Sequence, residues 1–184
     1  TKAHPAKIQG VTFLAGDKMF DCAQDQVDAL EAEGCEYIIC LGHLGIDAES
    51  TGNRSIDLLE KVDGIDVFID GHSHSTQEDI MAALGGTVTD AGDVTVTIGT
   101  DMVMTSAGTK LEEVGVVTID EAGHIDARTT SLESLTATDA DVAARAAKIQ
   151  AEIDKEYGTV FAKTEVALNG EKEPGNRTEE TNLG

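Results

Sequence analysis

Short apolar runs that end in glycine and histidine are the clearest pattern along this chain. Residues 36–41 lead into Gly42-His43, and residues 66–69 lead toward Gly71-His72. Runs of about four to six residues rich in Ile, Val, Tyr and Phe are typical of buried strands in an α/β sheet. A helix is expected between them, at 55–62. This β-α-β order with short connections predicts two neighbouring parallel strands.

The flanking patterns predict further elements. Upstream, we expect a short strand at 11–14 and an amphipathic helix at 21–33, with Asp21 as its N-cap and Gly34 as its stop. Downstream, Thr/Val-rich alternation predicts antiparallel strands, with a hairpin turn at 121–124. These strands are expected at 94–98, 102–104 and 115–119.

A long helix is expected at 139–157, with Thr138 as its cap and Gly158 as its stop, followed by a strand at 160–168. The apolar positions of the helix share one face: Val142, Ala146, Ile149 and Ile153. Together these elements predict an α/β fold.

The charge of the chain narrows the possible partners. Its formal net charge is −22 at pH 7 over 184 residues. Such a surface disfavours binding to nucleic acid or anionic membrane, whose phosphates need a basic surface. An acidic protein can still process phosphate esters when metal ions supply the local positive charge. No apolar stretch approaches the roughly 20 residues of a membrane span.

The first residues of the chain and its cysteines lead to two further expectations. The first residues show neither a signal-peptide pattern nor an initiator Met, which is expected of a processed or excised piece. The three cysteines, Cys22, Cys35 and Cys40, have no zinc-binding spacing. They are expected to be buried free thiols rather than metal ligands.

The histidines carry the candidate chemistry. Sites in α/β folds form at the carboxyl ends of the strands, so His43 and His72 are expected at one sheet edge, close enough to share an ion. Imidazole binds zinc, manganese, cobalt or iron. In extended chain, His72 and His74 point to opposite sides, so they serve different ions or one is a bystander. Asp70 is expected to support the ligands or to end the strand.

A single histidine after a strand is more often a hydrogen-bonded core or turn residue than a ligand. Here three of the five histidines gather in this pattern, which favours metal binding. The other two, His4 and His124, are expected to be surface residues.

These residues resemble the 5'-nucleotidase branch of the calcineurin-like metallophosphoesterases. Residues 41–45 resemble the family's GH motif, and residues 64–74 resemble its more specific GHSH motif. Further similar segments are 106–108 with 115–117, the helix at 139–157, and 177–184. The resemblance implies a partial α/β/β/α sandwich, its second half, with a C-terminal connecting helix. Residues 1–136 would belong to the catalytic domain, and 137–184 to the connector and the start of the C-terminal domain.

The resemblance also implies a reaction. Members are two-metal hydrolases in which metal-activated water attacks a phosphate ester. His43 and His72 would hold one of two divalent ions, Zn or Mn, and His74 the other. Arg177 lies near where the family places a phosphate-contacting arginine. The implied substrate is a nucleoside 5'-monophosphate or related ester, and the implied location is extracellular or in the cell envelope.

The departures from the family are equally informative. Its D-x-H, G-D-x-x-D and G-N-H-E/D motifs are absent from these 184 residues, so this chain is expected to be inactive alone. Its sheet edge, left without partner strands, is expected to form a homodimer or exchange strands. Alternatives within the class are a 2',3'-cyclic nucleotide phosphodiesterase, a nucleotide-sugar hydrolase or a sulfur-compound hydrolase. The alternative from another class is a non-catalytic binding or assembly protein that keeps the fold without metals.

Overall fold

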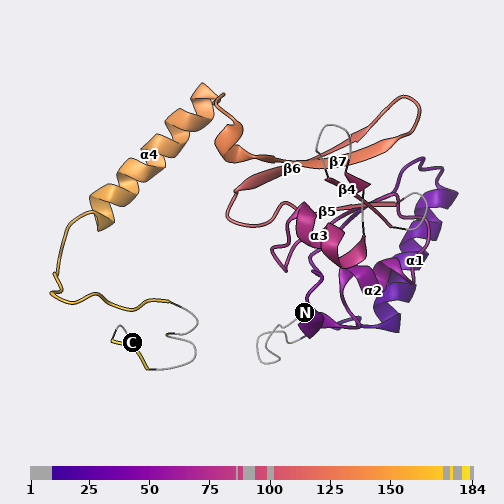
Figure 1. Cartoon of the computed structure of the whole chain (residues 1–184), viewed down its shortest axis with the longest axis horizontal. Coiled ribbons are helices and arrows are strands. Elements are labelled where there is room, and N and C mark those ends of the chain that lie inside the picture. Colours follow the sequence, from indigo (N-terminus) through magenta and orange to yellow (C-terminus); the bar gives the residue numbers. More distant parts are fainter. Residues whose placement is uncertain are drawn as a thin grey trace. The chain divides into compact units, whose positions relative to one another are not determined.

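The computed structural model describes residues 10–85, 87–88, 94–98, 102–171, 175 and 180–182 (Figure 1). The chain divides into two compact units, Thr1–Leu135 and Thr136–Gly184. The assignment of these units to a catalytic domain and a connector stays a prediction. None of the helices in the described part of the chain is long and apolar enough to cross a bilayer.

The first unit is built around a five-stranded sheet with the order β1-β2-β5-β4-β3. β1 pairs in parallel with β2, which confirms the predicted β-α-β arrangement, and β2 pairs in parallel with β5. β4 runs antiparallel to both β5 and β3. The strands are β1 (Ile39–Leu41), β2 (Val67–Ile69), β3 (Thr87–Val88), β4 (Val94–Ile98) and β5 (Met102–Thr105).

β1 and β2 are shorter than predicted. Before β1, the Ile38 amide donates to Asp66 Oδ2 at 2.7 Å and is therefore unavailable to the ladder. After β1, one more backbone bond joins the Gly42 amide to the Ile69 carbonyl at 2.8 Å, and beyond it the Leu44 amide donates to Asp70 Oδ1 at 3.0 Å.

Three helices pack on one face of the sheet: α1 (Asp17–Ala32), α2 (Ser55–Leu59) and α3 (Gln77–Leu84) (Figure 1). Cys40, Phe68 and Met104 stand in register across β1, β2 and β5 on this side. Phe68 and Met104 are fully buried. The helices therefore cover an apolar layer, whose burial drives the packing.

α1 ends where predicted, with Gly34 just beyond it at φ 85°, but it begins at Asp17 instead of Asp21. Its N-cap is Gly16, whose amide donates to Asn53 Oδ1 at 2.9 Å, so a tertiary contact decides the start. α3 was not expected from the pattern. Its overlooked signal is a capping box, in which Thr76 caps the Asp79 amide and Asp79 accepts from the Thr76 amide.

A second sheet consists of the hairpin β6 (Glu113–Ile119) and β7 (Ile125–Ser131). The two strands pair from Glu113↔Ser131 to Ile119↔Ile125, so the predicted turn at 121–124 is confirmed. β7 contacts β4 and β5, and its Ala127 is fully buried. The hairpin thus covers the sheet face opposite the helices.

The second unit contains α4 (Ala140–Tyr157). The prediction of its stop at Gly158 is confirmed, but its cap is Asp139 rather than Thr138. The Asp139 carboxylate accepts hydrogen bonds from the Asp141 and Val142 amides. An anionic cap also interacts favourably with the positive end of the helix dipole.

Two predicted strands are wrong. Neither 11–14 nor 160–168 forms a strand, and Phe13 and Phe161 are 43% and 99% exposed. A short extended run is stable only when a neighbouring strand pairs with it, and no described strand pairs with either segment.

Candidate metal centre

Two of the three candidate histidines lie side by side. His43 follows β1 and His72 follows β2, so the parallel pairing of these strands brings both to one edge of the sheet. The centroids of their rings are 5.1 Å apart, and the ring planes meet at 72°. His43 is exposed and His72 is half-buried. The two rings are therefore direct neighbours at this edge of the sheet.

The third histidine is placed differently from the expectation. His72 and His74 have φ values of 75° and 58°, so the backbone at these residues is left-handed rather than extended. The Ser73 amide donates to the Gly71 carbonyl at 3.0 Å, which tightens this turn. Non-glycine residues seldom adopt this conformation, and such residues often mark functional turns. The extended-chain argument for where His74 points is therefore wrong.

Asp70 joins the two histidine loops. Its Oδ1 accepts from the amides of Leu44, Gly45 and Gly71 at 3.0, 3.2 and 2.8 Å. Its Oδ2 also accepts from the Gly45 amide, at 3.1 Å. Hydrogen bonds to a carboxylate are stronger than neutral ones. A single side chain at the end of β2 therefore holds the loop that carries His43.

Serine side chains also support this loop. Ser55 is fully buried, and its hydroxyl donates to the Gly45 carbonyl at 3.0 Å. The Ser73 hydroxyl accepts from the Ile46 amide at 3.3 Å and lies 2.7 Å from the Ser75 hydroxyl. Gly45 itself is required, because its φ is 73° and an added Cβ would lie 3.0 Å from the Ser73 amide nitrogen.

The sequence predicts that Asp70 supports the ligands or ends the strand, and the structure places it directly after β2, bonded to the His43 loop. The local pattern does not indicate which distant loop it bonds, and it gives no signal for the serines. The one available signal is the position of Asp70, beside a glycine and a histidine at the end of an apolar run.

Three further residues were considered in the sequence: Arg177, His4 and His124. Arg177 and His4 lie outside the described residues. His124 is exposed, as expected, and its Nδ1 lies 2.9 Å from Asp120 Oδ2 in the β6–β7 turn.

The cysteines are free thiols, as predicted, but the prediction that they are buried is wrong. Cys22 and Cys35 are exposed, and Cys40 is half-buried in β1. Burial, and then the charge of Asp70, raise the pKa of the Cys40 thiol. The thiol form is a poor metal ligand, because metals bind the thiolate.

The candidate donors supply only part of a metal site. Within the part of the chain that the structure describes, no group of three or more His, Cys, Asp or Glu side chains is placed to hold one. His43 and His72 fit the role of two imidazole ligands, while Asp70 uses its oxygens on backbone amides. Since protein metal sites need three or four ligands, this pair fits a partial site.

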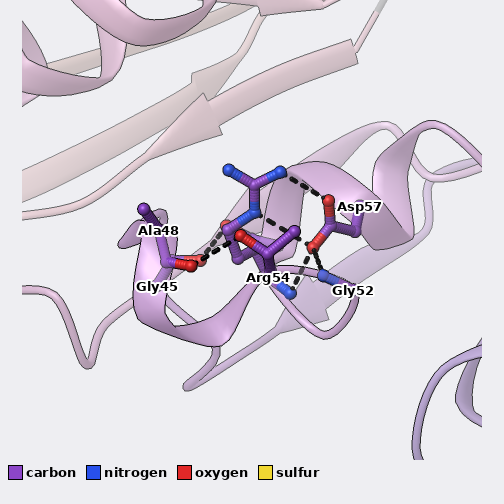
Figure 2. Close-up of polar contacts among 7 residues, drawn as sticks. Gly45, Ala48, Gly52, Arg54 and Asp57 are labelled. Carbon is purple, nitrogen blue, oxygen red and sulfur yellow. Dashed lines mark hydrogen bonds and ion pairs between the residues drawn. The ribbon is translucent and has the colours of Figure 1, made fainter.

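A charged pair stabilises the connection between the two histidine loops (Figure 2). Arg54 Nη2 donates to Asp57 Oδ1 at 2.7 Å, and Arg54 Nε donates to Asp57 Oδ2 at 3.0 Å. Asp57 Oδ2 also accepts from the Gly52 amide at 2.6 Å. The Arg54 hydrogen bonds are the main cause that lowers the pKa of Asp57 to about 2.

Replacing Asp57 with asparagine is expected to reduce the free energy of unfolding by about 1 kcal/mol at neutral pH, because the pair is partly screened by solvent. The folded-state pKa of Asp57 lies below its unfolded value. The stabilisation is therefore present above about pH 4 and is lost as the pH falls through about 2. Urea unfolding should show that the difference in the free energy of unfolding between wild type and variant shrinks as the pH is lowered from 6 to 2. Glu60→Gln, at the C-cap of α2, is the control, and a constant difference would contradict the assignment.

No protein-family model matches the chain. A stretch of 58 residues is 41% identical to the trifunctional nucleotide phosphoesterase protein YfkN of Bacillus subtilis (strain 168), and covers 29% of this chain and 4% of that protein. The structure is similar to the crystal structure of calcineurin-like phosphoesterase YfkN from Bacillus subtilis, with a TM-score of 0.54 at 20% identity. The described fold is part of a calcineurin-like phosphoesterase fold.

The match covers 83% of this chain and 47% of the crystallised chain, so this chain spans about half of that structure. Part of the chain is homologous to YfkN, a phosphoesterase. The predicted family resemblance and the predicted α/β fold class are thereby confirmed.

Proposed function

We propose that this chain forms part of a metal-dependent phosphoesterase that hydrolyses nucleoside 5'-monophosphates or related nucleotide esters. The observation that carries the proposal is the His43–His72 pair, whose ring centroids are 5.1 Å apart at the carboxyl ends of adjacent parallel strands. The partial homology to a nucleotide phosphoesterase supports the substrate class.

The chain's own residues have separate tasks in this proposal. His43 and His72 offer imidazole nitrogens to one divalent ion, Zn or Mn, and Asp70 holds the His43 loop in place through the Leu44 and Gly45 amides. The exposed His74 is available to a second ion. When bound, such ions activate water and neutralise charge on the phosphoryl oxygens.

Among the described residues, the two imidazoles do not complete a site, so we propose that the active protein supplies further ligands. This follows from the coordination that catalytic metals need, which exceeds two protein ligands. We therefore propose that turnover requires the whole protein and that this chain alone binds metal weakly.

Titration with Zn²⁺ tests the metal proposal in the 184-residue chain. We expect the imidazole NMR signals of His43 and His72 to shift together at millimolar Zn²⁺, because one ion contacts both rings. The signal of the exposed His124 provides an internal control. Shifts no larger than those of His124 would contradict the metal site and favour the metal-free binding protein.

A second prediction concerns the phosphatase activity of the isolated 184-residue chain, which we expect to be absent. With Zn²⁺ or Mn²⁺ present, hydrolysis of AMP by the 184-residue chain should equal that of a His72→Ala control, because the ligand set is incomplete. Phosphate release above that control would refute the predicted inactivity of the isolated chain.

A further inference from the structure

A buried glutamine directly follows the second histidine loop (residues 70–76). Gln77 is the first residue of α3 and is only 1% exposed. Both ends of its side-chain amide bond β5: Nε2 donates to the Met104 carbonyl at 3.1 Å, and Oε1 accepts from the Thr105 hydroxyl at 2.9 Å. Thr105 is buried as well. Removing one partner of such a buried pair leaves the other without a hydrogen bond and without water, which is the costly case.

The end of β5 also holds the start of the second histidine loop. The Asp70 amide donates to the Thr105 carbonyl at 2.9 Å, so Thr105 bonds the first residue of the loop through its backbone and Gln77 through its hydroxyl. Beyond β5, the Gly108 amide donates to the Ser75 carbonyl at 3.0 Å. Hydrogen bonds to one short segment therefore fix the loop at both of its ends.

Between these bonds the backbone of the loop is strained. His72 and His74 have φ values of 75° and 58°, in the left-handed region where a Cβ crowds the following carbonyl oxygen. Non-glycine residues keep this conformation only when the surrounding structure over-determines it. The bonds of Thr105 and Gln77 supply such a constraint, because they set the distance that the loop has to span.

We propose that Gln77 and Thr105 are positioning residues for His72 and His74. Their buried hydrogen bonds hold the ends of the loop at the separation that the two left-handed residues require, and this fixes the direction of both imidazoles. Gln77 and Thr105 act through the loop backbone and are not themselves proposed as ligands. The inference rests on the proposed metal function, in which outer groups orient the ligands, but the loop conformation is measurable without metal.

The alternative is a purely structural role, in which the Gln77–Thr105 bond only anchors α3 to the sheet. Ile80 separates the two readings, because it lies on the same helix and is fully buried in the apolar core. Truncating Ile80 loosens the packing of the helix without removing a hydrogen bond to the loop. A change of histidine conformation that is specific to Gln77 and Thr105 therefore indicates positioning.

Thr105→Val tests the proposal, because it removes the hydroxyl donor with little change in shape. The three-bond couplings between amide and Hα protons, which report φ, are measured at His72 and His74 in the metal-free 184-residue chain. We expect them to move from left-handed values toward conformational averages. The Zn²⁺ concentration at half of the His72 imidazole shift should rise about tenfold, the lower end for loss of groups that orient metal ligands. Gln77→Met, which removes both bonds, should have at least the same effect.

Two controls complete the experiment. Thr105→Ser keeps the hydroxyl and should restore the couplings and the Zn²⁺ response, while Ile80→Ala should lower stability to urea and leave the couplings unchanged. Unchanged couplings in both Thr105→Val and Gln77→Met would overturn the proposal, as would changes that Ile80→Ala reproduces or that Thr105→Ser does not reverse. A wild-type chain whose imidazoles do not respond to Zn²⁺ would refute the metal site alone, and the couplings would still decide the role of Gln77 and Thr105.

Discussion

Replacing Asp70 with alanine is expected to destabilise the first unit by about 3 kcal/mol and to separate the rings of His43 and His72. The change removes the acceptor for the amides of Leu44, Gly45 and Gly71. A hydrogen bond to a charged group contributes roughly 1.5–3 kcal/mol, and such contributions do not add fully within one network. Urea unfolding and imidazole NMR shifts measure the two effects.

Asp66→Ala is the matched control for this prediction. Asp66 precedes the same strand and accepts one bond, from the Ile38 amide at 2.7 Å. Its loss should cost about 1 kcal/mol and leave the histidine signals in place. Asp70→Asn retains Oδ1 in an amide and should fall between wild type and Asp70→Ala. Equal histidine shifts in Asp70→Ala and Asp66→Ala would show that Asp70 does not position His43.

Replacing Gly42 with alanine is expected to destabilise the first unit by about 1–3 kcal/mol, because the new methyl group overfills the core. A Cβ at this position would lie 2.6 Å from Phe68 Cε1, and the ring of Phe68 is fully buried. Gly42 does not have a positive φ, so the cost comes from the contact and not from backbone strain. Thermal and urea unfolding give the magnitude.

A double-mutant cycle isolates the contact. Phe68→Leu makes room for the new methyl group, so Gly42→Ala should cost less in that background than in wild type. If Gly42→Ala lowers the free energy of unfolding equally in both backgrounds, its effect arises elsewhere in the loop and not from the contact with Phe68. Since Gly42 precedes His43, the same contact also limits how closely the histidine loop can approach β2.

Phe68 and Asp70 hold opposite ends of the short loop that carries His43. Phe68 contacts the loop start at Gly42, and Asp70 bonds the loop end at Leu44 and Gly45. His43 lies between these two anchors. Its ring can therefore stay beside His72 even though it is exposed, and such preorganisation lowers the cost of binding an ion.

The sequence anticipated some elements better than others. The parallel pair β1–β2, the β6–β7 turn and the end of α4 follow from local patterns of apolar residues and glycine. The segments at 11–14 and 160–168 have similar apolar content but no partner strand among the described residues. α3 is not predicted by the apolar pattern, because the helix has only eight residues and its sole start signal is the Thr76–Asp79 capping box.

By itself the sequence determined that two apolar runs form adjacent parallel strands and that His43 and His72 follow them, because strand alternation and short connections act over a few residues. Only the tertiary structure decided that Asp70 bonds a loop 25–26 residues away. It also decided that the backbone of His74 is left-handed and that Ile39 and Leu41 are exposed. These features depend on which distant groups meet across the sheet, and local patterns contain no information about that.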